Sequence, residues 1–159
     1  MSESQKDIAY KIILVLVIYF LLARPILQKL GVLKDKSQRV IEEQQNLPQK
    51  QNPFNPNFYK FAPVGSKIIT RQTANNLAKN LYDSFGYFYD DEAGITAVFS
   101  SLRTQSQVSF LADVFSQIYK EDILEFMKRG KGLMPEAGLS DSELSTIIDK
   151  VNRLSKYNY

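Results

Sequence analysis

An uncharged apolar run near the N-terminus constrains this chain more than any other feature. Residues 12–23 read IILVLVIYFLLA, without a single charge. A membrane-spanning helix needs about 20 apolar residues, and residues 8–27 supply that length if Lys11 and Arg24 extend their stems to the headgroups. Such a helix is roughly 30 Å long, the hydrocarbon thickness of a bilayer. We therefore predict a membrane anchor over residues 1–36 that spans about residues 8–27.

The predicted anchor has an apolar centre and a basic boundary at each end. The residues predicted to span the membrane include Ile12, Leu14, Leu16, Ile18, Phe20 and Leu22. Those predicted at the membrane interface are Lys11, Arg24 and Lys29. Two basic residues precede the run and five follow it closely, so the positive-inside rule puts the C-terminal side in the cytoplasm or an equivalent, capsid-facing compartment.

Two other interpretations of the apolar run stay open. A buried core helix is disfavoured because the run is apolar on all sides in a chain too small to enclose it. A cleaved signal peptide fits the length of the run, but the following LLARP has no small-x-small cleavage site.

A polar segment rich in Pro, Asn and Gln follows the predicted anchor, at residues 37–69. Residues 35–47 could extend a helix, but Val40 and Ile41 are its only interior apolar residues. Four prolines then disfavour a regular helix or a central strand: Pro48, Pro53, Pro56 and Pro63. We predict an irregular stalk here.

Four aromatic residues stand out in this polar segment. They are Phe54, Phe58, Tyr59 and Phe61. Aromatic side chains in a polar stretch indicate docking, either onto the chain's own folded domain or onto a partner protein. We assign them as partner-binding residues, so that changing the three phenylalanines to Ser is expected to alter the stability of the domain by less than about 1 kcal/mol.

Residues 70–159 are predicted to form a compact five-helix domain. The first helix begins at Thr73 and presents Ala74, Leu77, Ala78, Leu81, Tyr82 and Phe85 on one face. Asp90 or Asp91 caps the second, and Thr104-x-x-Gln107 opens the third. The fourth runs over about residues 121–129 and stops at Gly130, and Ser140-x-x-Glu143 forms a capping box for the fifth. The predicted fold class is all-α.

The composition excludes several kinds of chemistry. The chain has no Cys and no His, which removes thiol nucleophiles, disulfides, Cys/His zinc sites and His-based proton relays. Glu121, Asp122 and Glu125 could suggest a carboxylate pair for glycoside hydrolysis, but a solvated helix face beside Lys120, Lys128 and Arg129 explains them more simply. We predict no catalytic residues, no metal site and no cofactor.

The distribution of charge disfavours binding to nucleic acid. Residues 1–65 hold nine Lys/Arg against five Asp/Glu, whereas residues 66–159 hold eleven against twelve. A nucleic-acid-binding domain concentrates positive charge on its folded part. The basic excess instead flanks the apolar run, where anionic lipid headgroups are the expected counter-charge. The short basic patch at residues 128–131 is expected to be an ordinary helix C-terminus favoured by the helix dipole.

Residues 81–128 resemble one annexin-type repeat. The matching pieces are Gly86, Asp91-Glu92, Ile95, Leu102-Arg103, Gln107, Phe115, Tyr119 and Asp122-Ile123-Leu124. The resemblance implies a five-helix layout. It does not extend to the calcium loop, because the chain has Gly86-Tyr87-Phe88-Tyr89-Asp90 where the family pattern resembles G-x-G-T.

A single helical domain on an N-terminal anchor is also similar in layout to small membrane proteins of bacteriophages that keep a bilayer beneath the capsid. We therefore expect a membrane-anchored structural protein that tethers a bilayer to the capsid or to another protein assembly, with a possible homo-oligomeric state. A bacterial inner-membrane adaptor in a larger complex is the alternative, and a lytic or lipid-binding accessory protein is a third.

Overall fold

A computed structural model describes residues 11, 13, 36–86, 90–131 and 137–157 of the chain. In these residues the fold is all-α and contains no strand. The elements in chain order are α3 (Lys36–Asn46), the 3-10 helix η2 (Phe58–Phe61), α4 (Arg71–Asp83), α5 (Glu92–Ser100), α6 (Gln105–Tyr119), α7 (Ile123–Arg129) and α8 (Asp141–Asn152).

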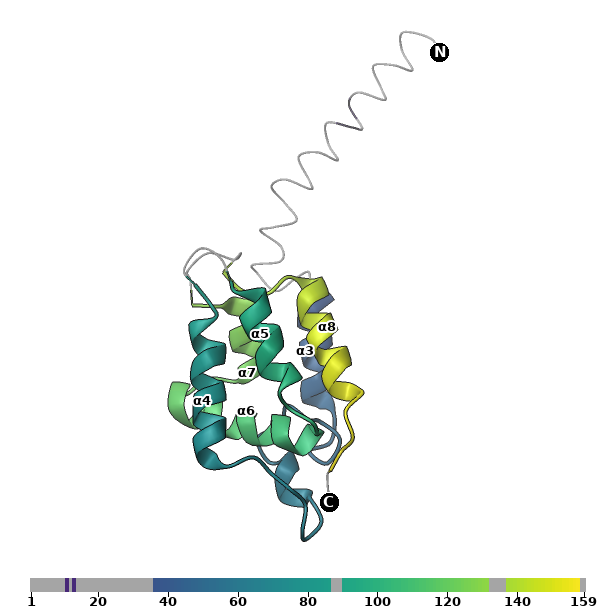
Figure 1. Cartoon of the computed structure of the whole chain (residues 1–159). Coiled ribbons are helices and arrows are strands. Elements are labelled where there is room, and N and C mark those ends of the chain that lie inside the picture. The colour runs from purple at the N-terminus through teal and green to yellow at the C-terminus, as the bar shows by residue number, and fades with distance from the viewer. Residues whose placement is uncertain (1–10, 12, 14–35, 87–89, 132–136, 158–159) are drawn as a thin grey trace.

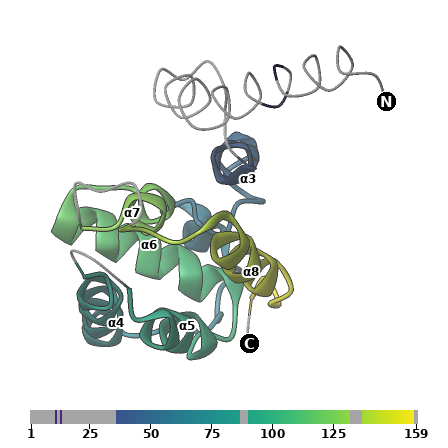
Figure 2. The same cartoon turned by 90° about the horizontal axis from the view of Figure 1, so that it is seen from above.

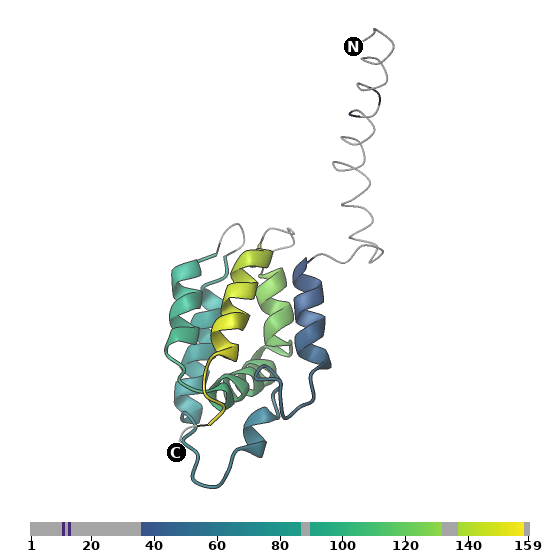
Figure 3. The same cartoon turned by 90° about the vertical axis from the view of Figure 1, so that its right-hand side faces the viewer.

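Helix α6 forms the centre of the domain. It lies across the direction of α4, α5 and α8, which stand side by side around it (Figure 1). Seen from above, α3 and the α4–α5 pair lie on opposite sides of the molecule (Figure 2), and the third view agrees (Figure 3). Val108, Leu111 and Phe115 of α6 are fully buried, so one face of this helix forms the middle of the core.

Most of the predicted helix starts are present. Ser140 and Glu143 form the reciprocal capping box of α8, and the side chains of Asp91 and Thr104 cap α5 and α6. Two starts differ from the prediction. Helix α4 begins at Arg71 because the hydroxyl of Thr70, not Thr73, accepts the first free backbone N–H, from Thr73 at 3.1 Å. Helix α7 begins at Ile123, capped by Asp122.

The end of α7 is set by a glycine. Gly130 has φ +67°, and a Cβ there would come within 1.7 Å of the carbonyl oxygen of Ala137. The backbone N–H of Gly130 still donates to Phe126 at 2.7 Å, which closes the helix. The helix therefore ends at Gly130, as predicted. Ala137 packs directly against the backbone of this turn.

The polar segment before residue 70 is part of the folded domain rather than a stalk separate from it. Helix α3 packs against α8 and α7, and η2 packs against α6. Ile41 is 2% exposed and belongs to the same core as the five predicted helices. The prolines are accommodated in hydrogen-bonded turns, for example Gln51 N–H to Pro48 O at 2.7 Å. Core contacts thus begin at Val40 and Ile41 of α3, ahead of the predicted boundary at residue 70.

The predicted membrane span lies almost entirely outside the described residues. Only Lys11 and Ile13 of that stretch are described, both helical and exposed. Among the helices that the structure describes, none combines the length and apolar character needed to cross a bilayer.

Candidate functional site

Two of the four aromatic residues assigned to partner binding are buried in the chain's own domain. Phe54 is 1% exposed and lies 6.4 Å from Phe99, ring to ring. Phe58 is fully buried and stacks on Tyr157 at 5.7 Å. This is the first of the two alternatives that the sequence left open. Neither side chain has surface to offer a partner, because tertiary contacts across more than 40 residues of chain cover both.

The backbone around these aromatics is fixed by polar contacts to α6. The hydroxyl of Ser109 donates to Asn55 O at 2.6 Å and accepts the backbone N–H of Tyr59 at 3.0 Å. The hydroxyl of Tyr59 donates to Asp113 at 3.1 Å. Partial burial and the adjacent carboxylate of Asp113 raise the pKa of Tyr59. Tyr59 is thus held on α6 and only half available to a partner.

Phe61 belongs to an exposed projection that we call the tip, defined as residues 59–71 together with Lys50. Phe61 is 39% exposed, and the ammonium of Lys50 lies 5.1 Å from the centre of its ring. A β-turn follows, in which Ser66 N–H donates to Pro63 O at 3.1 Å and Gly65 has φ +93°. The turn presents Val64 without any cover, at 104% relative exposure.

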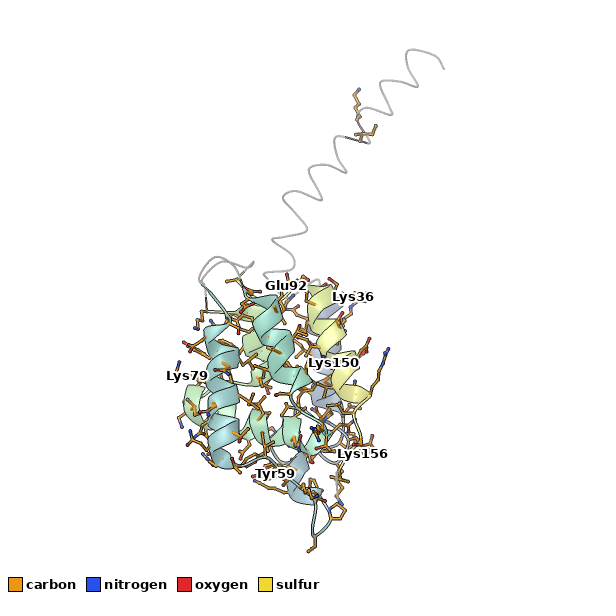
Figure 4. All side chains as sticks on the ribbon, viewed as in Figure 1. Lys36, Tyr59, Lys79, Glu92, Lys150 and Lys156 are labelled. Carbon is orange, nitrogen blue, oxygen red and sulfur yellow. The ribbon has the colours of Figure 1, made fainter. Side chains whose placement is uncertain are left out.

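The tip lies at one end of the domain. Tyr59 and Lys156 are labelled at that end, whereas Glu92 and Lys36 lie at the other (Figure 4). Apolar and basic side chains alternate along the tip and are all exposed: Lys50, Lys60, Phe61, Val64, Lys67, Ile68 and Arg71. The sequence signal for this feature is the Pro63-Val64-Gly65-Ser66 turn flanked by lysines, which the aromatic-residue argument did not use.

A groove of about 540 Å³ runs between α4 and α5. Small residues form much of its floor, among them Ser84, Gly94, Ala97 and Ser101. A Cβ at Gly94 would come within 2.5 Å of both the Asp91 carboxylate and the Ser84 hydroxyl, so those two side chains would have to move to make room for it. Asp83 and Asp91 lie at one end of the groove, where Asp83 is paired with Lys79 and Lys131. The spacing Gly94-x-x-Ala97-x-x-x-Ser101 was its sequence signal.

A second hollow, of about 230 Å³, lies between α5 and α8. The carboxyl groups of Glu92 and Glu143 both line it. A hydrogen bond shared with Glu143 raises the pKa of Glu92, whereas the bonds that Ser140 donates lower the pKa of Glu143. Partial burial and the charge of Glu143 raise the pKa of Asp90. Among the residues described, no group of three or more carboxylates has the arrangement of a metal site.

The carboxylates considered for hydrolysis are engaged in surface contacts. Glu121 accepts two hydrogen bonds from the Arg129 guanidinium at 2.8 Å, and Glu125 accepts one from Gln45 of α3 at 3.1 Å. In the basic patch that follows, Lys128 pairs with Asp141 at 3.1 Å and Lys131 with Asp83 at 3.7 Å. These contacts fit the solvated helix face and the ordinary helix end that the sequence favoured.

No protein-family model, curated protein or solved structure matches this chain.

Proposed function

We propose that this protein is a membrane-anchored structural protein that tethers a bilayer to a protein assembly, specifically the internal membrane of a lipid-containing phage to its capsid. The observation that carries the proposal is that the apolar N-terminal run and the folded domain are joined by a short connection. A basic-flanked apolar run of spanning length is followed, after only eight residues, by a folded helical domain that begins at Lys36. The short connection keeps the domain at the surface of the bilayer.

We propose the α4–α5 groove as the contact with the protein assembly. Its small residues, among them Gly94, Ala97 and Ser101, let another backbone approach closely. It lies on the side of the domain opposite α3. Phe61, which the sequence assigned to partner binding, lies outside this groove, and the annexin-type resemblance is kept only as a proposal about helical layout.

The experiment is quantitative mass spectrometry of purified lipid-containing particles from cells that produce this chain. We expect the chain in the particles, and we expect Ala97→Trp, which fills the groove, to lower its copy number. Ala93→Trp is the matched control, since Ala93 is exposed on the same helix and does not line the groove.

Each outcome decides between candidate functions. Absence of the chain from particles would end the virion proposal. Retention in a host inner-membrane complex would then support the adaptor alternative. Equal incorporation of the Ala97 and Ala93 variants would exclude the groove as the contact while leaving the membrane anchorage to its own test.

A further inference from the structure

The tip has an unusual charge environment. No Asp or Glu occurs from residue 44 to residue 82, a stretch that contains Lys50, Lys60, Lys67, Arg71 and Lys79. The first four of these are exposed and belong to the tip, and the Lys50 ammonium lies 5.1 Å from the centre of the Phe61 ring. Glu92 lies at the other end of the domain (Figure 4), and the one carboxylate described in contact with the tip is that of Asp113, which accepts from Tyr59. The near-neutral net charge of the folded part thus includes a tip that holds four cations and no acidic residue of its own.

The apolar side chains of the tip stand on a convex turn rather than in a groove. Val64 occupies the outermost position of the 63–66 turn, and Phe61 and Ile68 flank it at 39% and 37% exposure. A convex apolar apex cannot be covered by a second convex surface, but it can enter the soft boundary between headgroups and acyl chains. Lysines around such an apex then lie at the level of anionic headgroups.

We propose that the tip inserts into the anionic surface of the bilayer that holds the N-terminal run. The inference rests on the proposed function for that anchor. Four cations attract anionic lipid, and three apolar side chains enter the boundary. A duplex nucleic acid also offers charge, but Val64 and Phe61 could enter it only by unstacking base pairs, which costs free energy. Protein interfaces are depleted in Lys at their centre.

The same bilayer is the favoured source of lipid because the tip is a weak binder by itself. A single short insertion with a few lysines gives marginal, reversible membrane binding, and a second signal in the same chain makes it effective. The eight residues between the predicted span and α3 reach roughly 28 Å when extended. That reach allows the domain to lie along the surface, so that the axis from Lys36 to the tip follows the bilayer.

This orientation has a consequence for the rest of the domain. Since α3 and the α4–α5 pair lie on opposite sides of the molecule, a domain that rests with its α3 side on the bilayer turns the α4–α5 groove away from the lipid. The tip thereby orients the surface that we propose for the protein assembly.

The test uses the full chain, which contains no Cys and so accepts a single nitroxide label at Val64→Cys. The labelled chain is reconstituted in vesicles of phosphatidylcholine alone or of an equimolar mixture with phosphatidylglycerol. Collision with oxygen and with a water-soluble nickel complex reports whether the label lies in lipid or in water. The control label is at Ala93→Cys, exposed on α5 at the opposite end.

We expect the Val64 label to lie in lipid in the mixed vesicles and in water in the neutral ones, and the Ala93 label to lie in water in both. Lys60→Glu with Lys67→Glu should lower the lipid-immersed fraction roughly tenfold. Lys79→Glu with Lys150→Glu, the same change of net charge away from the tip, should leave it unchanged.

A Val64 label that stays in water in the mixed vesicles would overturn the inference. So would immersion that requires clustering of vesicles, which would show an opposing bilayer, or protection of the label by double-stranded DNA or by a protein instead of lipid. Failure of the anchor is seen separately, as failure of the full chain to float with neutral vesicles. In that case the comparison of the Val64 label between the two lipid compositions, with the chain added from solution, still decides the tip.

Discussion

Two phenylalanines of the 3-10 helix η2 have opposite environments. Phe58 is fully buried against Tyr157, and Phe61 is 39% exposed at the tip. Truncation of a buried Phe removes its contacts and leaves a cavity, so we expect Phe58→Ala to lower the free energy of unfolding by about 3–5 kcal/mol. Phe61→Ala should change it by less than about 0.5 kcal/mol. Urea unfolding of the full chain in detergent measures both.

This pair separates the two interpretations of the aromatic segment. The sequence alone predicted small effects for both residues, as expected for a stalk. A Phe58→Ala variant as stable as the unchanged chain would contradict the burial described here, and a strongly destabilised Phe61→Ala variant would remove Phe61 from the exposed tip.

Two glycines with positive φ provide a second test at the residue scale. At Gly65 a Cβ would meet nothing within 4 Å, whereas at Gly130 it would meet the Ala137 carbonyl at 1.7 Å. Gly65→Ala should therefore cost only the conformational penalty, about 1–2 kcal/mol. Gly130→Ala adds the steric conflict and should cost more, because the chain after α7 must move. Thermal unfolding of both variants gives the difference, and equal losses would contradict the close approach at Gly130.

At the scale of the elements, helix caps carry local stability. The Thr70 hydroxyl caps α4, and the helix residue Thr73 donates its backbone N–H to it. We expect Thr70→Ala to cost about 1 kcal/mol of unfolding free energy, and Thr73→Ala, which keeps that backbone donor, to cost less. The reverse order in urea unfolding would restore the helix start that the sequence predicted.

The contact between α5 and α8 predicts a pH dependence. The hydrogen bond shared with Glu143 raises the pKa of Glu92 above its usual 4.5, so the folded state binds that proton more tightly than the unfolded state. This contribution to stability is present at acidic pH and is lost as the pH rises through the raised pKa. Two other groups face Glu92 and Glu143: Ser140, whose hydrogen bonds lower the pKa of Glu143, and Asp90, whose pKa the charge of Glu143 raises.

Glu92→Gln isolates this contribution, because the amide donates to Glu143 at every pH. We expect the variant to unfold at a higher temperature than the unchanged chain at neutral pH, with the difference shrinking as the pH falls through the raised pKa toward 4.5. Thermal unfolding over a pH series measures it. A difference that grows on acidification would contradict the shared hydrogen bond.

The elements show which parts of the fold local sequence can predict. The capping box of Ser140 and the stop at Gly130 depend on residues within a few positions of each other, and both are as predicted. Helix α3 has only Val40 and Ile41 as interior apolar residues, yet it packs because α8 and α7 supply the opposing surface. The burial of Phe54 and Phe58 likewise depends on residues more than 40 positions away, such as Phe99 and Tyr157.

The candidate surfaces were less predictable than the helices. The groove depends on how α4 and α5 are placed, which no single segment encodes. The tip combines a turn with four cations, Lys50, Lys60, Lys67 and Arg71. The sequence does not show that the turn projects from the domain, which follows from the full exposure of Val64. The net charge of residues 66–159 did not reveal the run from residue 44 to residue 82 that contains no Asp or Glu.

For the whole molecule, one account unites these parts. We propose that the apolar N-terminal run holds the chain in a bilayer. The first helix of the described domain, α3, begins at Lys36, and the tip and the groove are formed by different parts of that domain. The account places the domain at a membrane surface, between lipid and a protein assembly. All of its functional steps depend on the N-terminal run being in lipid.

Vesicle flotation of the full chain, followed by alkaline carbonate extraction, tests that dependence most directly. The account predicts that the chain floats with neutral phosphatidylcholine vesicles, stays in the pellet after carbonate treatment, and loses both properties when residues 1–35 are removed. A full-length chain that remains in the aqueous phase without detergent, and folds equally well there, would contradict it.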